Sequence, residues 1–141
     1  MKSLNYWQFL QVGKEQWIIQ RNPLVQVYMR LWGPLGVHTR IRNTRVVNAV
    51  RRLNLPAEVR ILDAGCGHAY ATFWLARHYS QYRIWAIDSD PKLISNAKKI
   101  ALQLELSNVT FILADICVLR LEEIATFDLI FSIDLLEHIA K

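Results

Sequence analysis

The sequence predicts an α/β fold with a doubly wound parallel sheet, and three observations lead to that prediction. Short apolar segments of strand length alternate with longer segments of helical periodicity along the second half of the chain. Two of these apolar segments end in an aspartate, at Asp63 and Asp88, and a third is followed by Asp115. A Gly-x-Gly turn comes directly after the first of them.

The first expected strand, Val59–Asp63, leads into the turn that contains Gly65 and Gly67. These glycines can adopt backbone angles that other residues avoid, and they leave room for a ligand against the main chain. A helix is predicted for Tyr70–Tyr79, and its N-terminus would present unpaired N–H groups and the positive end of the helix dipole. Taken alone, the turn fits either a nucleotide-binding loop or a tight turn without a ligand.

The second expected strand, Arg83–Asp88, ends in a carboxylate at the place where doubly wound folds hold ribose hydroxyls. A helix is predicted from Pro91 to about Glu105, because proline suits a first helical turn and apolar residues recur along one side. The remaining expected strands are Val109–Ala114 and Phe127–Ile133.

The first 56 residues differ from the rest and are predicted to form a separate helical segment. They carry nine Lys and Arg against one acidic residue, whereas residues 57–141 carry eight against eleven, so the basic character comes from the front of the chain. The segment is also rich in aromatic residues. Its last helix is predicted for His38–Asn54, with its arginines mainly outward and an inward apolar face of Ile41, Val46, Val47, Val50 and Leu53.

Residues 58–141 resemble a class I S-adenosylmethionine-dependent methyltransferase, in the broad group that includes quinone-biosynthesis methyltransferases. Four motifs match in order: Leu-Asp-x-Gly-Cys-Gly, Ile-Asp-x-x-Pro, Ala-Asp-Ile, and Phe-Asp-Leu-Ile leading to Leu-Glu-His-Ile. The resemblance implies a Rossmann-like sheet with spatial strand order 3-2-1-4. The family has three further strands, so residues 57–141 are expected to be the N-terminal half of the domain and the chain a fragment. One departure is Ala69, which replaces the third loop glycine and is expected to relax the turn.

The resemblance assigns the methionine end and the ribose of S-adenosylmethionine to the first two strands. Asp63, Gly65 and Gly67 are expected to line the methionine end, largely through backbone groups. Asp88 is expected to hold the ribose hydroxyls. An aspartate at a strand end can also be a helix cap or a turn former without a ligand.

The adenine and the transferred methyl group are assigned in the same way to the third and fourth strands. Asp115 is expected to face the adenine amino group, and Ile116 to pack on the ring. Ser132 and Ile133 are expected to border the sulfonium and the methyl group.

Three residues after the fourth expected strand leave several interpretations open. If Asp134, Glu137 and His138 lie on one helix, their spacing places them on one face, where they could meet a divalent cation. His138 could instead be a general base, because the unperturbed pKa of histidine is near 6.5. A structural or substrate-facing Glu-His pair is the third interpretation. We select His138 as the catalytic candidate and predict no metal site.

We therefore predict methyl transfer from S-adenosylmethionine to a small-molecule acceptor, with the methylated atom unresolved. The alternative is a binding or interaction module that keeps the fold without catalysis, which the missing strands and Ala69 favour. A nicotinamide-dependent oxidoreductase is disfavoured by Asp63 directly before the loop and by the Leu-Glu-His-Ile motif.

Partners and location are also predicted. The front segment could pack on the sheet, cover the substrate as a lid or contact a membrane surface peripherally. A nucleic-acid partner is disfavoured because no nucleic-acid-binding module is recognisable. The exposed edge of the fourth strand could pair with a second copy. Two cysteines without metal-type spacing, no apolar start and no membrane-spanning run predict a cytoplasmic protein.

Overall fold

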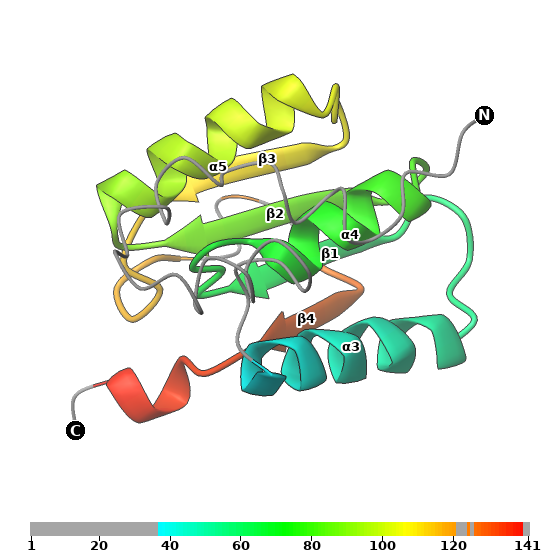
Figure 1. The fold of residues 1–141 in the computed structure, drawn as a ribbon, viewed down its shortest axis with the longest axis horizontal. Helices are drawn as coiled ribbons and strands as arrows, with labels where there is room; N and C mark the ends of the chain where they lie inside the picture. Colours follow the sequence, from blue (N-terminus) through cyan, green and yellow to red (C-terminus); the bar gives the residue numbers. More distant parts are fainter. Residues whose placement is uncertain (1–36, 121–123, 125, 140–141) are drawn as a thin grey trace, which may run out of the picture. The chain divides into compact units, whose positions relative to one another are not determined.

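The computed structural model describes residues 37–120, 124 and 126–139. The aromatic-rich part of the front segment, residues 1–36, therefore lies outside the described residues. Contacts divide the chain into two compact units, residues 1–42 and 43–141. The helices are α3 (Val37–Arg52), α4 (Tyr70–His78), α5 (Pro91–Gln103) and the short 3₁₀ helix η3 (Leu136–His138), and the strands are β1 (Arg60–Ala64), β2 (Arg83–Asp88), β3 (Val109–Leu113) and β4 (Leu129–Ser132) (Figure 1).

The four strands form one parallel sheet in the order β3-β2-β1-β4, which confirms the predicted fold class and strand order. Strand β1 is central and pairs with β2 on one side and β4 on the other. Because all the strands are parallel, their carboxyl ends lie at one edge of the sheet. The strand order reverses beside β1, and doubly wound sheets bind ligands in the crevice at such a point.

One face of the sheet is covered by helices. Val50 of α3 and Leu75 of α4 pack with Ile61 and Ile84 of the two central strands in a buried cluster. Helix α5 lies over β2 and β3, and buries Ile94, Ala97 and Ala101. Asp90 caps α5 by accepting hydrogen bonds from the backbone N–H groups of Lys92 and Leu93, as expected for a helix with proline in its first turn.

The other face holds a second cluster. Leu62 and Ala64 of β1 and Ile87 of β2 are its buried members, and the segment after β3 packs against them through Ile116, Leu119, Ile124 and Phe127. Alternation along β1 thus sends Ile61 and Asp63 toward the helices and Leu62 and Ala64 toward this segment.

The predicted inward face of the helix at residues 38–54 is wrong at both of its ends. Val47 and Val50 are buried, but Ile41 is 45% exposed and Leu53 is 53% exposed. Leu53 lies beyond the last residue of α3, so helical spacing no longer directs its side chain toward the sheet.

Candidate cofactor site

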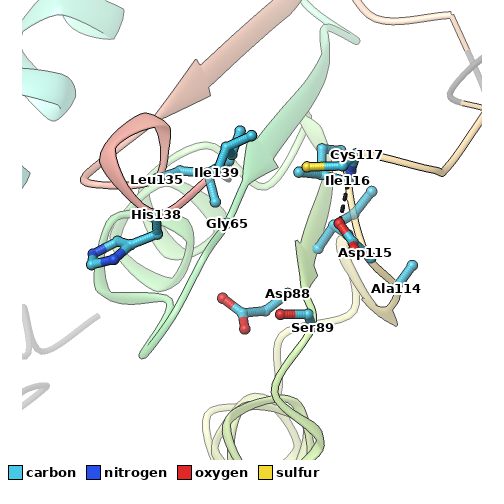
Figure 2. A pocket seen from close by; sticks show the side chains of 11 residues that line it. Gly65, Asp88, Ser89, Ala114, Asp115, Ile116, Cys117, Leu135, His138 and Ile139 are labelled. Carbon is cyan, nitrogen blue, oxygen red and sulfur yellow. Dashed lines mark hydrogen bonds between the residues drawn. The ribbon is translucent and has the colours of Figure 1, made fainter. Parts of the chain in front are cut away.

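A cavity of about 380 Å³ lies at the carboxyl edge of the sheet. Segments that follow all four strands contribute to its lining, so residues far apart in the sequence converge there (Figure 2). The lining residues are Gly65, Ile87, Asp88, Ser89, Ala114, Asp115, Ile116, Cys117, Leu135, His138 and Ile139.

The loop between β1 and α4 has an unusual backbone. Gly65, Gly67 and Ala69 all have positive φ angles, of 73°, 52° and 56°. The backbone N–H groups of Gly65 and Cys66 both donate to the carbonyl oxygen of Ile87, at 2.9 and 2.8 Å, which ties the loop to the end of β2. The loop therefore has a fixed backbone conformation that residues with a side chain disfavour.

The two glycines differ in what surrounds them. A Cβ atom at Gly65 would lie 2.7 Å from Cδ1 of Leu135, so a side chain there collides with the segment after β4. A Cβ atom at Gly67 would have no neighbour within 4 Å. Gly65 thus allows close packing within the protein, whereas Gly67 leaves open space above the loop.

Asp88 connects the loop to the next helix. Its Oδ2 accepts a hydrogen bond from the backbone N–H of Gly67 at 2.8 Å, and its Oδ1 accepts one from the backbone N–H of Asp90 at 2.9 Å. A carboxylate has about four acceptor positions, so two remain after these bonds. The half-buried side chain lines the cavity and can accept two more donors from a ligand.

Asp115 and Ile116 stand together after β3. Oδ1 of Asp115 accepts a hydrogen bond from the backbone N–H of Cys117 at 2.9 Å, which forms a turn and fixes the carboxylate at the cavity. The second oxygen is available to an N–H donor, and Ile116 adds an apolar surface beside it. Asp88, Asp115 and Ile116 are thereby brought together as the sequence predicted.

Asp63 lies below the loop and outside the cavity lining. It is 2% exposed, and its Oδ2 accepts a hydrogen bond from the hydroxyl of Thr72 in the first turn of α4. Burial raises the pKa of Asp63 to about 7; the hydrogen bond from Thr72 opposes this shift and the charge of Asp88 adds to it. The side chain therefore supports the loop from beneath.

The residues after β4 are arranged differently from the expected helix. Asp134 has a φ of 55° and precedes η3, whereas Glu137 and His138 lie within it, so the three do not share one helical face. Of the described residues, no group of three or more His, Cys, Asp and Glu side chains is placed to hold a metal ion. His138 lines the cavity, and Figure 2 shows its ring on the opposite side of Asp88 from Asp115. Ser132 is exposed, pairs with Ala64 in the sheet and is not in the lining.

Sequence reasoning missed several residues that shape this site. Leu135 and Ile139 line the cavity, and Thr72 holds Asp63. The apolar character of Leu135 and Ile139, on either side of the Glu-His pair, could have indicated that they pack against the protein, because apolar side chains after a strand tend to be buried. Cys117 is exposed and also lines the cavity.

A protein-family model described as a methyltransferase domain matches residues 55–141, more than half of the chain. The chain belongs to the class I S-adenosylmethionine-dependent methyltransferases. This confirms the family and the cofactor that the four motifs predicted. The parallel sheet and the loop after β1 are thus those of a methyltransferase domain.

Two curated relatives are similar to part of this chain. A malonyl-[acyl-carrier protein] O-methyltransferase from Bacillus anthracis is 38% identical over 82 residues, which are 58% of this chain and 29% of that protein. A pavine N-methyltransferase from Thalictrum flavum subsp. glaucum is 35% identical over 78 residues, which are 55% of this chain and 21% of that protein. The chain therefore spans less than a third of the length of these curated relatives.

A solved methyltransferase has the same arrangement of strands. The crystal structure of coclaurine N-methyltransferase, bound to N-methylheliamine and S-adenosylhomocysteine, matches with a TM-score of 0.60 and 26% identity. The match covers 68% of this chain and 28% of that one.

The residues of this methyltransferase fit its cofactor. Two acceptor positions remain on Asp88 for a pair of ribose hydroxyls, and one oxygen of Asp115 remains for an amino group, whereas Gly67 is not among the residues that line the cavity. Among the described residues, no helix is both long and apolar enough to cross a membrane.

Proposed function

We propose that the protein transfers a methyl group from S-adenosylmethionine to a small-molecule acceptor. The observation that supports this proposal is the convergence of Gly65, Asp88 and Asp115 on one cavity, where both carboxylates keep acceptor positions for a ligand. The relatives include two O-methyltransferases and two N-methyltransferases, which supports an oxygen or nitrogen acceptor without choosing between them.

The bound cofactor supplies an activated methyl group, so the chain's own residues mainly need to bind, orient and exclude water. Asp88 fixes the ribose, and Asp115 with Ile116 fixes the base, which together determine the position of the methionine end. Leu135 packs over Gly65 and shields that end from solvent with an apolar side chain. His138 at the cavity wall accepts the proton of an O–H or N–H acceptor.

Calorimetric titration of the full chain with S-adenosylhomocysteine tests the cofactor site. We expect micromolar binding, no binding of NAD, and at least tenfold weaker binding by Asp88→Asn, which keeps the shape of the side chain but removes its charge. Glu105→Gln is the matched control, because it removes one exposed negative charge at the end of α5 and should bind as the wild type does.

Turnover separates the proposal from its alternative. The assay supplies S-adenosylmethionine together with a panel of phenols, carboxylic acids and amines. A protein that binds S-adenosylhomocysteine but methylates no member of this panel would be a binding module and not an enzyme. Equal binding of NAD and S-adenosylhomocysteine would contradict the cofactor assignment itself.

A further inference from the structure

One leucine joins the segment after β4 to the glycine loop. Ala64 at the end of β1 pairs with Ser132 at the end of β4, so the residues that follow these two strands lie side by side. Three atoms of Leu135, which are Cδ1, Cβ and Cδ2, lie 2.7, 3.1 and 3.1 Å from the position that a Cβ atom of Gly65 would occupy. The leucine side chain therefore fills the space that the glycine leaves beside the backbone.

Leu135 also fixes the segment that carries His138. Its side chain packs against the second core cluster, whose buried members are Leu62, Ala64 and Ile87. The helix η3 that follows buries no residue of its own, and the backbone N–H of His138 donates to the carbonyl oxygen of Leu135 at 2.9 Å. So short a helix is not stable by itself, and the position of His138 depends on the residue that holds its N-terminal end.

The loop on the other side of this contact is tied to the carboxylate proposed for the ribose. The backbone N–H of Gly67, two residues after Gly65, donates to Oδ2 of Asp88 at 2.8 Å. Asp88, Leu135 and His138 all line the cavity (Figure 2). A continuous series of contacts thus leads from Asp88 through the loop and Leu135 to His138.

We propose that Leu135 is a positioning residue, which through its contact with Gly65 sets the position of His138 relative to the cofactor loop. This inference rests on the proposed function, in which His138 takes a proton from the acceptor. A base must lie within hydrogen-bond reach of the proton that it removes. Because Gly65 also lines the cavity, the contact ties the position of the base to that of the bound cofactor.

The contact can be disturbed from either side. Leu135→Ala removes the side chain, whereas Gly65→Ala places a methyl group where it collides with the leucine. Both changes should displace His138. Only Gly65→Ala should also weaken cofactor binding strongly, because its φ of 73° strains an alanine and because Gly65 belongs to the loop itself. In the double variant the smaller side chain at position 135 makes room for the methyl group, so the loss of affinity should be smaller than in Gly65→Ala alone.

The test follows the imidazole signals of the full chain by NMR, with ¹⁵N-labelled histidine, before and after saturation with S-adenosylhomocysteine. His138→Gln identifies the signals of His138, because it deletes them, and calorimetry gives the affinity of each variant. Leu136→Ala is the matched control, since this neighbouring leucine is 76% exposed and does not line the cavity. Leu135→Met keeps the apolar volume and is the conservative replacement.

We expect S-adenosylhomocysteine to shift the His138 signals in the wild type, in Leu136→Ala and in Leu135→Met. In Leu135→Ala the shift should decrease by about half or more, while the affinity stays within about threefold of the wild type. With an acceptor found in the panel, kcat of Leu135→Ala should decrease about tenfold or more, because a displacement of about 1 Å is enough for such a loss.

An unchanged shift of His138 in Leu135→Ala, even with a lower Tm, would overturn the inference and leave the cofactor site intact. A wild type that binds S-adenosylhomocysteine without any shift of His138 would do the same, as would an affinity of Leu135→Ala as low as that of Gly65→Ala. If Leu135→Ala does not fold, Gly65→Ala decides, since an undisplaced His138 there contradicts the contact. Failure of the wild type to bind S-adenosylhomocysteine would overturn the proposed function as well.

Discussion

Ala69 shows at the scale of one residue how a loop tolerates a side chain in a backbone conformation that favours glycine. Its φ of 56° lies in the left-handed region, yet its methyl group is 1% exposed and packs in the core. The left-handed conformation costs an alanine about 1–2 kcal/mol. Two effects oppose this cost. The lower conformational entropy of alanine in the unfolded chain stabilises the folded protein by about 0.5–1 kcal/mol relative to glycine, and burial of one methyl group stabilises it by about 0.8 kcal/mol. These terms nearly cancel.

The substitution Ala69→Gly is therefore expected to change the free energy of unfolding by less than about 1 kcal/mol, because the relief of strain is offset by the lost methyl group and the added chain entropy. Urea denaturation measures this difference. Ala69→Val is the informative comparison and should be clearly destabilising, because a β-branched residue is a genuine outlier at positive φ. A large stabilisation by glycine would show that the methyl group is not well packed.

Asp63 gives a second prediction at this scale, independent of any ligand. Burial raises its pKa from 3.8 to about 7, so the folded protein keeps a proton that the unfolded chain loses between these values. The wild type should consequently lose stability as the pH rises from about 4 to about 7. Asp63→Asn cannot titrate, so its free energy of unfolding relative to the wild type should increase from pH 5 to pH 8 in urea titrations. Parallel pH profiles of the two proteins would contradict the assignment.

The sequence predicts the position of a site residue where a motif contains it. It does not predict a residue whose role depends on a contact formed only in the folded protein. Asp88 and Asp115 could be placed because each follows an apolar run whose carboxyl end must reach the same sheet edge. Thr72 could not, since its bond to Asp63 depends on how α4 is rotated. Leu135 could not either, because only the docked fourth strand brings it onto Gly65.

Asn108 stabilises three elements at once. Its side-chain amide donates to the carbonyl oxygens of Ala76, Tyr79 and Tyr82, each at 3.1 Å. Two of these carbonyls belong to the end of α4 and the turn after it, where a helix leaves its last oxygens without intrahelical donors. One half-buried amide before β3 thus fixes the connection between α4 and β2.

The substitution Asn108→Asp should destabilise the protein by about 1–3 kcal/mol, because it replaces the NH2 group and its two N–H donors with one carboxylate oxygen that faces three carbonyl oxygens. Thermal unfolding followed by circular dichroism measures the loss as a decrease in Tm. Gln81→Glu makes the same chemical change at an exposed position in the same connection and should leave the Tm nearly unchanged. Equal effects of the two changes would show that the amide contributes no more than surface charge does.

At the scale of elements, the sequence predicted every described strand and the three α-helices to within a few residues. Apolar runs bounded by charged or turn residues are sufficient for that in a parallel sheet. Asp134, Glu137 and His138 do not lie on one helix, because Asp134 adopts a left-handed φ and only η3 follows it. A backbone reversal of this kind leaves no periodic signal in the sequence.

For the molecule as a whole, the fourth strand defines an edge. Strand β4 pairs with β1, and no other described strand lies on its far side. Ile130, near the middle of β4, is 54% exposed. An apolar strand with unpaired backbone groups is a template for pairing with another chain.

We therefore expect the full chain to self-associate with increasing concentration, and Ile130→Lys to weaken this association at least several-fold, because a charged side chain on an edge strand opposes pairing. Sedimentation velocity over a hundredfold range of concentration measures the effect. Thr110→Lys, on the exposed face of β3, adds the same charge at the other edge of the sheet and is the control. A wild type that remains monomeric throughout would exclude the edge as an interface.

The register of β4 on β1 also sets the order in which the cavity can form. Asp128 accepts a hydrogen bond from the backbone N–H of Arg60 across a sequence separation of 68 residues, whereas β1, α4 and β2 are close neighbours in the chain. Closing such a long loop is entropically slower than forming local contacts. We therefore expect the wall contributed by Leu135, His138 and Ile139 to assemble after the wall that holds Asp88. A ligand that contacts both walls can therefore bind the nascent chain only after the segment from Leu135 to Ile139 has emerged from the ribosome.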